Sequence, residues 1–164
     1  MKKSKLTLHP TPLAQWHCLI GEAQQTSKRL LTEPLESYLV YMLMRFCKRP
    51  DAFNHAMALE LLATNDMAVK DDKLRDVGDK CLLVSGLFPG IIEKRNVSSR
   101  YYVDLGRDAY SRLAHYLPQA SAELYQHLCQ FFLDLMNVLQ AIDQTYQETT
   151  QQGLILQPSL ITRH

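Results

Sequence analysis

The stretch QASAELYQHLCQFFLDLMNVLQAIDQTYQ, residues 119–147, decides the fold class of this chain. Its apolar residues recur at alternating spacings of four and three: Leu124, Leu128, Phe131, Leu135, Val138 and Ile142. A second apolar stripe runs beside the first, through Tyr125, Cys129, Phe132, Met136 and Leu139. This spacing marks a helix face, and two adjacent stripes are wider than a two-stranded coiled-coil seam. The sequence therefore predicts one long C-terminal helix that forms the spine of a bundle, or is shared between a core and a dimer interface.

The rest of the chain carries the same helical periodicity, divided by clear start and stop signals. Thr11, Asp51 and Ser98 are suited to cap helices, and Pro12 and Pro34 suit the first turn of a helix. The helices expected before the C-terminal one cover approximately residues 12–30, 33–49, 52–63, 68–87 and 99–116. Gly21 is a candidate interruption of the first helix, and residues 89–97 are expected to form a loop.

The predicted fold class is therefore all-α, a single-domain helical bundle of about six helices. Residues 1–10 read as a polar N-terminal tail, 11–147 as the helical domain and 148–164 as a C-terminal tail. Strand-like alternation is absent from the sequence. Within this fold, Gly78, Ser85 and Gly106 lie beside apolar helical stripes, where small residues allow another helix to approach closely.

Composition and charge narrow the class of protein. Hydrophobic residues make up 46% of the chain and charged residues 21%, which is typical of a folded globular domain. The formal net charge is +1, whereas a dedicated DNA-binding domain usually carries a clear basic excess. No apolar run is long enough for a membrane-spanning helix, and none follows the basic N-terminus as in a signal peptide.

The four cysteines stand far apart in apolar helical stretches, at positions 18, 47, 81 and 129. No C-x-x-C pair occurs, so neither a zinc ribbon nor a redox dithiol is indicated. We expect buried free thiols in the reducing cytoplasm.

No signature of catalysis or of cofactor binding is present. The sequence lacks H-E-x-x-H, G-x-S-x-G, a P-loop and a dinucleotide fingerprint. The six histidines have no acid at the spacing that a helical metal site requires. We therefore expect no metal and no cofactor, and the sequence does not favour an enzyme.

One segment, residues 93–110, is dense in arginine and tyrosine. Arg100 and Arg107 share a helix face with Asp104, close to the start of the helix. Arginines beside tyrosines at a helix N-terminus are suited to hold an anion or a stacked base. The candidate ligand-binding residues are Asp79, Arg100, Tyr101, Tyr102 and Arg107. The alternative is structural, an intrahelical Arg100–Asp104 pair with tyrosine rings in the core.

The same region carries a resemblance. It contains Gly78-Asp79, Ser85-Gly86-Leu87-Phe88, Tyr101-Tyr102, Leu105-Gly106 and Ala109-Tyr110, in that order. This order resembles a group of uncharacterised bacterial proteins with a GD…SGxF…YYxxLGxxAY pattern. The resemblance covers about a fifth of the chain and implies a bacterial origin and a shared helical-pair unit. It implies no activity.

These observations favour a non-catalytic helical module that binds a protein partner, with a homodimer as one form of that binding. Two alternatives stay open: a domain that binds a small ligand or anion between the helices at 68–87 and 99–116, and an enzyme of an unrecognised class. Convergent polar side chains around a cavity would indicate the ligand site, and perturbed ionisable groups in an accessible pocket would indicate an enzyme. Nucleic-acid binding is the least favoured function. Its candidate residues form two alternative groups: Arg45, Lys48 and Arg49, or Lys94, Arg95 and Arg100.

Overall fold

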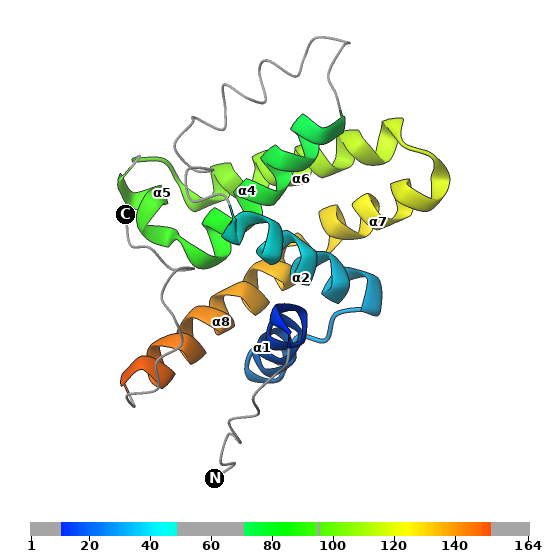
Figure 1. Cartoon of the computed structure of the whole chain (residues 1–164). Helices are drawn as coiled ribbons and strands as arrows, with labels where there is room; N and C mark the ends of the chain where they lie inside the picture. Colours follow the sequence, from blue (N-terminus) through cyan, green and yellow to red (C-terminus); the bar gives the residue numbers. More distant parts are fainter. Residues whose placement is uncertain (1–10, 49–70, 95, 152–164) are drawn as a thin grey trace.

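The computed structural model describes residues 11–48, 71–94 and 96–151, and all the secondary structure in these ranges is helical (Figure 1). The helices are α1 (Pro12–Ser27), α2 (Glu33–Cys47), α4 (Asp71–Leu87), α5 (Pro89–Lys94), α6 (Ser99–Tyr116), α7 (Gln119–Gln130) and α8 (Phe132–Gln151). The all-α prediction is confirmed. The expected tail at 1–10, the expected helix at 52–63 and residues 152–164 lie outside the described residues. Within the described part, no helix is long and apolar enough to span a membrane.

The helix starts follow the capping signals of the sequence. The Thr11 hydroxyl accepts a hydrogen bond from the Ala14 backbone N–H at 3.2 Å, and Ser98 does the same for Tyr101 at 3.3 Å. Gly21 does not interrupt α1, which continues to Ser27 and ends where Lys28 adopts a left-handed conformation with φ 55°. The expected extension of this helix to residue 30 is therefore wrong.

The expectation of a loop over residues 89–97 is also wrong, because Pro89–Lys94 forms the short helix α5. Proline is well accommodated in the first turn of a helix, since the N–H that it lacks would have no intrahelical partner there. Ile92 is buried and fixes this turn against the core. The chain reaches α6 within a few residues, and among them Asn96 takes the left-handed conformation, with φ 55°.

The expected single helix over 119–147 is two helices that are interrupted at Phe131 (Figure 1). Phe131 departs from helical geometry, with φ −97° and ψ 19°, although no proline or glycine lies nearby. The two halves pack on different neighbours: α7 lies chiefly against α6, whereas α8 lies against α1 and α4. Phe132 is fully buried directly after the break. The second half extends to Gln151, beyond the predicted end at 147.

The helix that is enclosed on every side is α4. Every residue from Val77 to Gly86 is buried, including Asp79, Lys80 and Ser85. A helix buried around its whole circumference lies inside the bundle rather than on its surface. Its main neighbours are α6 and α8, so α4 has the central place that the sequence suggested for the C-terminal helix.

Three glycines allow α4, α6 and α8 to pack closely against one another. A Cβ atom at Gly78 would lie 2.5 Å from the Tyr110 ring, and one at Gly106 would lie 2.7 Å from the Phe132 ring. A Cβ at Gly86 would lie 2.5 Å from Leu139. The predicted close approach at Gly78 and Gly106 is therefore confirmed, and it brings α6 and α8 against α4.

Replacing these glycines tests the packing. We expect Gly78→Ala and Gly106→Ala to lower the free energy of unfolding by about 1–3 kcal/mol, because the new methyl group overlaps a buried ring. The matched control is Gly21→Ala in α1, where nothing lies within 4 Å of an added Cβ. That variant should be more stable by about 0.5–1 kcal/mol, because alanine is the better helix former. Urea unfolding followed by circular dichroism measures all three. Equal effects at the three positions would contradict the close packing.

Candidate functional site

A carboxylate without solvent contact lies at the centre of the bundle. Asp79 is fully buried on α4. Its Oδ1 atom accepts hydrogen bonds from the hydroxyl groups of Tyr38, at 2.6 Å, and Tyr110, at 2.7 Å. Its Oδ2 atom accepts a hydrogen bond from the guanidinium group of Arg45, which makes an ion pair. One side chain thus connects α2, α4 and α6.

Helix geometry explains why these groups meet. Tyr38 and Arg45 are two turns apart on α2 and therefore share a face. Tyr110 reaches the carboxylate because Gly78, directly before Asp79, leaves room for its ring. Tyr125 of α7 completes the cluster, with its ring centroid 6.0 Å from that of Tyr38 and 5.9 Å from that of Tyr110. We refer to Tyr38, Arg45, Asp79, Tyr110 and Tyr125 as the Asp79 cluster.

Burial controls the ionisation of this cluster. Desolvation raises the pKa of Asp79 from 3.8 to about 6, against the opposing effects of Arg45 and the two tyrosine hydroxyls. The pKa values of Tyr38 and Tyr110 also rise, first because of burial and then because of the adjacent Asp79 charge. Both tyrosines therefore stay protonated and donate to the carboxylate.

The interactions of the Asp79 cluster are suited to hold α2, α4 and α6 together. Asp79 has no exposed surface, while the Arg45 side chain is 35% exposed and closes the outer side of the site. An acid that takes part in proton transfer must come within hydrogen-bond reach of its substrate, and Asp79 already has three protein donors. Its charge orients helices.

The five residues predicted as a ligand site occupy different environments. Asp79 is in the buried cluster, and Tyr102 is 3% exposed in the core. Arg100 is exposed and lies 3.8 Å from Asp104, the intrahelical pair that was the structural alternative. The Tyr101 ring packs edge-on against Tyr102 and is partly exposed. Arg107 faces a depression that none of the other four lines.

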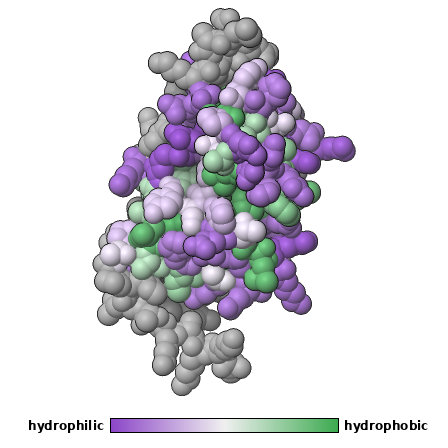
Figure 2. Space-filling model, turned by 90° about the vertical axis from the view of Figure 1, so that its right-hand side faces the viewer, coloured by the Kyte–Doolittle hydropathy of each residue, from purple (hydrophilic) through white to green (hydrophobic). Residues whose placement is uncertain are grey.

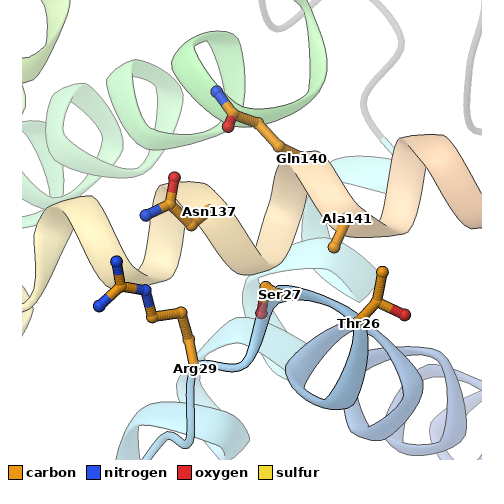
Figure 3. Close-up of a pocket in the computed structure, with 6 residues that line it drawn as sticks. All are labelled: Thr26, Ser27, Arg29, Asn137, Gln140 and Ala141. Carbon is orange, nitrogen blue, oxygen red and sulfur yellow. The ribbon is translucent and has the colours of Figure 1, made fainter.

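The surface of the described residues includes a depression on each of two sides of the bundle, among others. The larger, about 550 Å³, lies between α6 and α7 and is lined by Arg107, Ser111, Ala114, His115, Gln126, Cys129 and Gln130. The smaller, about 320 Å³, lies between the end of α1 and α8. Figure 3 shows Thr26, Ser27 and Arg29 on the α1 side of it, with Asn137, Gln140 and Ala141 on α8. No member of the Asp79 cluster lines either of these two depressions.

The cysteines are free at all four positions, as expected, but only Cys81 is fully buried. Cys18, Cys47 and Cys129 are partly exposed, so the expectation of four buried thiols is wrong in that respect. Burial raises the pKa of Cys47 to about 11, which keeps it a thiol at neutral pH. Among the residues that the structure describes, no three histidine, cysteine or acidic side chains are grouped as a metal would need.

Sequence reasoning missed most of the Asp79 cluster. Arg45 was predicted only as a candidate for nucleic-acid binding, and Tyr38 was not predicted as a functional residue. Asp79 and Tyr110 do belong to the GD…AY pattern, so that pattern held part of the signal. The seven-residue spacing of Tyr38 and Arg45 was the remaining sign, and it gains meaning only once Asp79 is known to be buried.

Comparisons with known protein families, curated proteins and solved structures find no match to this chain.

The raised pKa of Asp79 predicts a pH dependence of stability. Between pH 6 and 3.8 the folded state binds a proton that the unfolded state does not, so this group stabilises the fold as the pH falls. Going from pH 7 to 5 should add about 1 kcal/mol to the free energy of unfolding. Because other groups also titrate, the measurement is the difference between wild type and Asp79→Asn in urea unfolding at both pH values. A wild type that loses stability relative to Asp79→Asn on acidification would contradict the raised pKa.

The tyrosine donors give a second prediction. Tyr110→Phe removes one hydrogen bond to the buried carboxylate and should lower the free energy of unfolding by about 1–3 kcal/mol at pH 7. It should also raise the pKa of Asp79 further, because a donor that favours the charged form is lost. Tyr116→Phe is the matched control, since Tyr116 is 68% exposed on the same helix, and it should change stability by less than about 0.5 kcal/mol. Equal effects of the two substitutions would show that the Tyr110 hydroxyl contributes nothing.

Proposed function

We propose that this protein is a non-catalytic helical module that binds a protein partner through apolar side chains on its surface. The observation that carries the proposal is the exposure of large apolar residues. The side chains concerned are Leu30, 90% exposed, Tyr116, 68%, Tyr41, 60%, and Leu133, 50%. Contact through such side chains removes apolar surface from water, which is the main driving force of protein association.

Leu30 is the clearest of these side chains. It lies in the short connection between α1 and α2, beside Leu31, which packs against the core. The Leu31 N–H donates to the buried side chain of Gln24 at 2.8 Å, and Gln24 in turn donates to Glu36 of α2 at 3.0 Å. The connection is therefore held in one conformation that places Leu31 inward and Leu30 outward. A connection that is already held in one conformation loses little backbone entropy when a partner covers Leu30.

The interior gives less support to the other functions. The buried ionisable groups are bonded to one another and lie apart from both depressions. The Arg45 charge, which sequence reasoning offered for nucleic-acid binding, is paired with Asp79. Lys48 and Lys94 remain exposed, whereas Arg49 and Arg95 lie outside the described residues.

Site-specific photocrosslinking in cells tests the proposal. A photoreactive amino acid is placed, one position at a time, at Leu30, Tyr41, Tyr116 and Leu133. We expect discrete adducts of defined mass at one or more of these positions, because a partner lies against the apolar group. The matched control is Arg100, whose side chain is 88% exposed but charged, and which should give none. Absence of adducts at all four positions, or equal labelling at Arg100, would contradict the proposal.

A further inference from the structure

We propose that the partner at one of these positions is a second copy of this chain, joined across a two-fold axis. The surface concerned comprises Arg29, Leu30, Leu133 and Asp134, which we call the Leu30–Leu133 patch. This inference rests on the proposed function, because it names the partner for one of the exposed apolar surfaces.

An ion pair assembles the patch from two distant parts of the chain. The Arg29 guanidinium group lies 3.2 Å from the Asp134 carboxylate. This pair brings the α1–α2 connection, which carries Leu30, against the first turn of α8, which carries Leu133. The flanking side chains of α8, Phe132 and Leu135, are fully buried, so Leu133 is on the outer face of that helix. Each residue of the ion pair therefore has an exposed leucine as its neighbour in the sequence.

The charges of the patch favour a second copy as the occupant. Contacts across a two-fold axis are reciprocal: where one residue of the first copy contacts a second residue of the other copy, the same contact recurs with the copies exchanged. The patch has one cation and one anion side by side, so rotation by half a turn places Arg29 of each copy next to Asp134 of the other. Both side chains have exposed surface for this contact, 52% for Arg29 and 33% for Asp134. Two copies of the patch therefore match each other: opposite charges meet across the axis, and the leucines of one copy can contact apolar side chains of the other.

The smaller depression, between the end of α1 and α8, lies beside the patch and resembles the polar rim of a protein interface. It shares Arg29 with the patch, and its other lining side chains are mostly hydroxyls and amides. In Figure 3, Ser27 and Thr26 at the end of α1 lie opposite the α8 side chains. Protein interfaces typically surround an apolar centre with such a polar, hydrated rim. The rim extends the surface without adding unpaired charge.

The dimer should be weak and dependent on concentration. Figure 2 shows one face of the molecule, on which hydrophilic side chains predominate and hydrophobic groups gather only in small patches. Few apolar anchors per copy leave only a small surplus over the entropy lost on association. Sedimentation equilibrium over a wide concentration range is therefore the suitable method.

Charge exchange between two variants tests this arrangement. In the dimer, Arg29→Asp places the carboxylate at position 29 of one copy next to the Asp134 carboxylate of the other copy. Asp134→Arg likewise places two cations next to each other at this contact. Each variant alone should dimerise at least tenfold more weakly than wild type. An equimolar mixture of the two should recover a heterodimer, because Asp at position 29 of one copy then meets Arg at position 134 of the other. An ion pair confined to one chain cannot give this recovery.

Three controls keep the experiment decisive. The combined variant Arg29→Asp/Asp134→Arg restores both pairs and should dimerise within about threefold of wild type, with an unchanged circular dichroism spectrum. Arg100→Asp alters an exposed arginine away from the patch and should not affect the dissociation constant. Leu30→Ser should weaken dimerisation without changing the unfolding midpoint.

Two results would overturn the inference: a wild-type chain that stays monomeric at all concentrations, or a mixture that fails to recover the heterodimer. If the chain is monomeric but crosslinks to another protein at Leu30 or Leu133, the second-copy inference fails and the proposed function stands. If no exposed apolar position gives an adduct and the chain is monomeric, both fail.

Discussion

The burial of the Asp79 carboxylate is the constraint on which the arrangement of this bundle depends. A charge removed from water costs several kcal/mol unless donors replace its hydration. Here the donors come from two other helices, Tyr38 and Arg45 on α2 and Tyr110 on α6. Any alternative packing that displaced one of these helices would leave the carboxylate short of a partner. Such an ion pair contributes little net stability, but the loss of one partner is strongly destabilising, because the other charge then stays buried without compensation.

The close packing around α4 follows from the same constraint. Tyr110 reaches Asp79 only because the preceding residue is Gly78, and Gly106 one turn earlier on α6 admits the Phe132 ring. Phe132 begins α8, so the position of α6 against α4 also determines where the last helix starts. The break at Phe131 then separates a segment that packs on α6 from one that packs on α1 and α4. Small residues and one buried acid thus fix most of the described bundle.

This arrangement shapes the surface that remains for function. The polar groups with the most perturbed pKa values, Tyr38, Asp79 and Tyr110, are buried and hydrogen-bonded to one another, and they hold helices together. The outside presents isolated apolar side chains, and one pair of them flanks the Arg29–Asp134 ion pair. This surface supports the proposal that the protein binds a protein partner, since a helical scaffold needs to gain little order on contact.

The sequence by itself determined the helical class, the starts of α1, α2, α6 and α7, and the close packing of Gly78 and Gly106. These features are local: capping uses neighbouring residues, and a helical stripe reports which face is buried. The break at Phe131 and the helix at Pro89–Lys94 were decided by the tertiary structure, because a periodic stripe continues unchanged when its two halves pack on different neighbours. The same reason explains the candidate site. Asp79 could be selected from the sequence, but its partners Tyr38, Arg45 and Tyr110 come from other helices, and only the folded bundle brings them to one carboxylate.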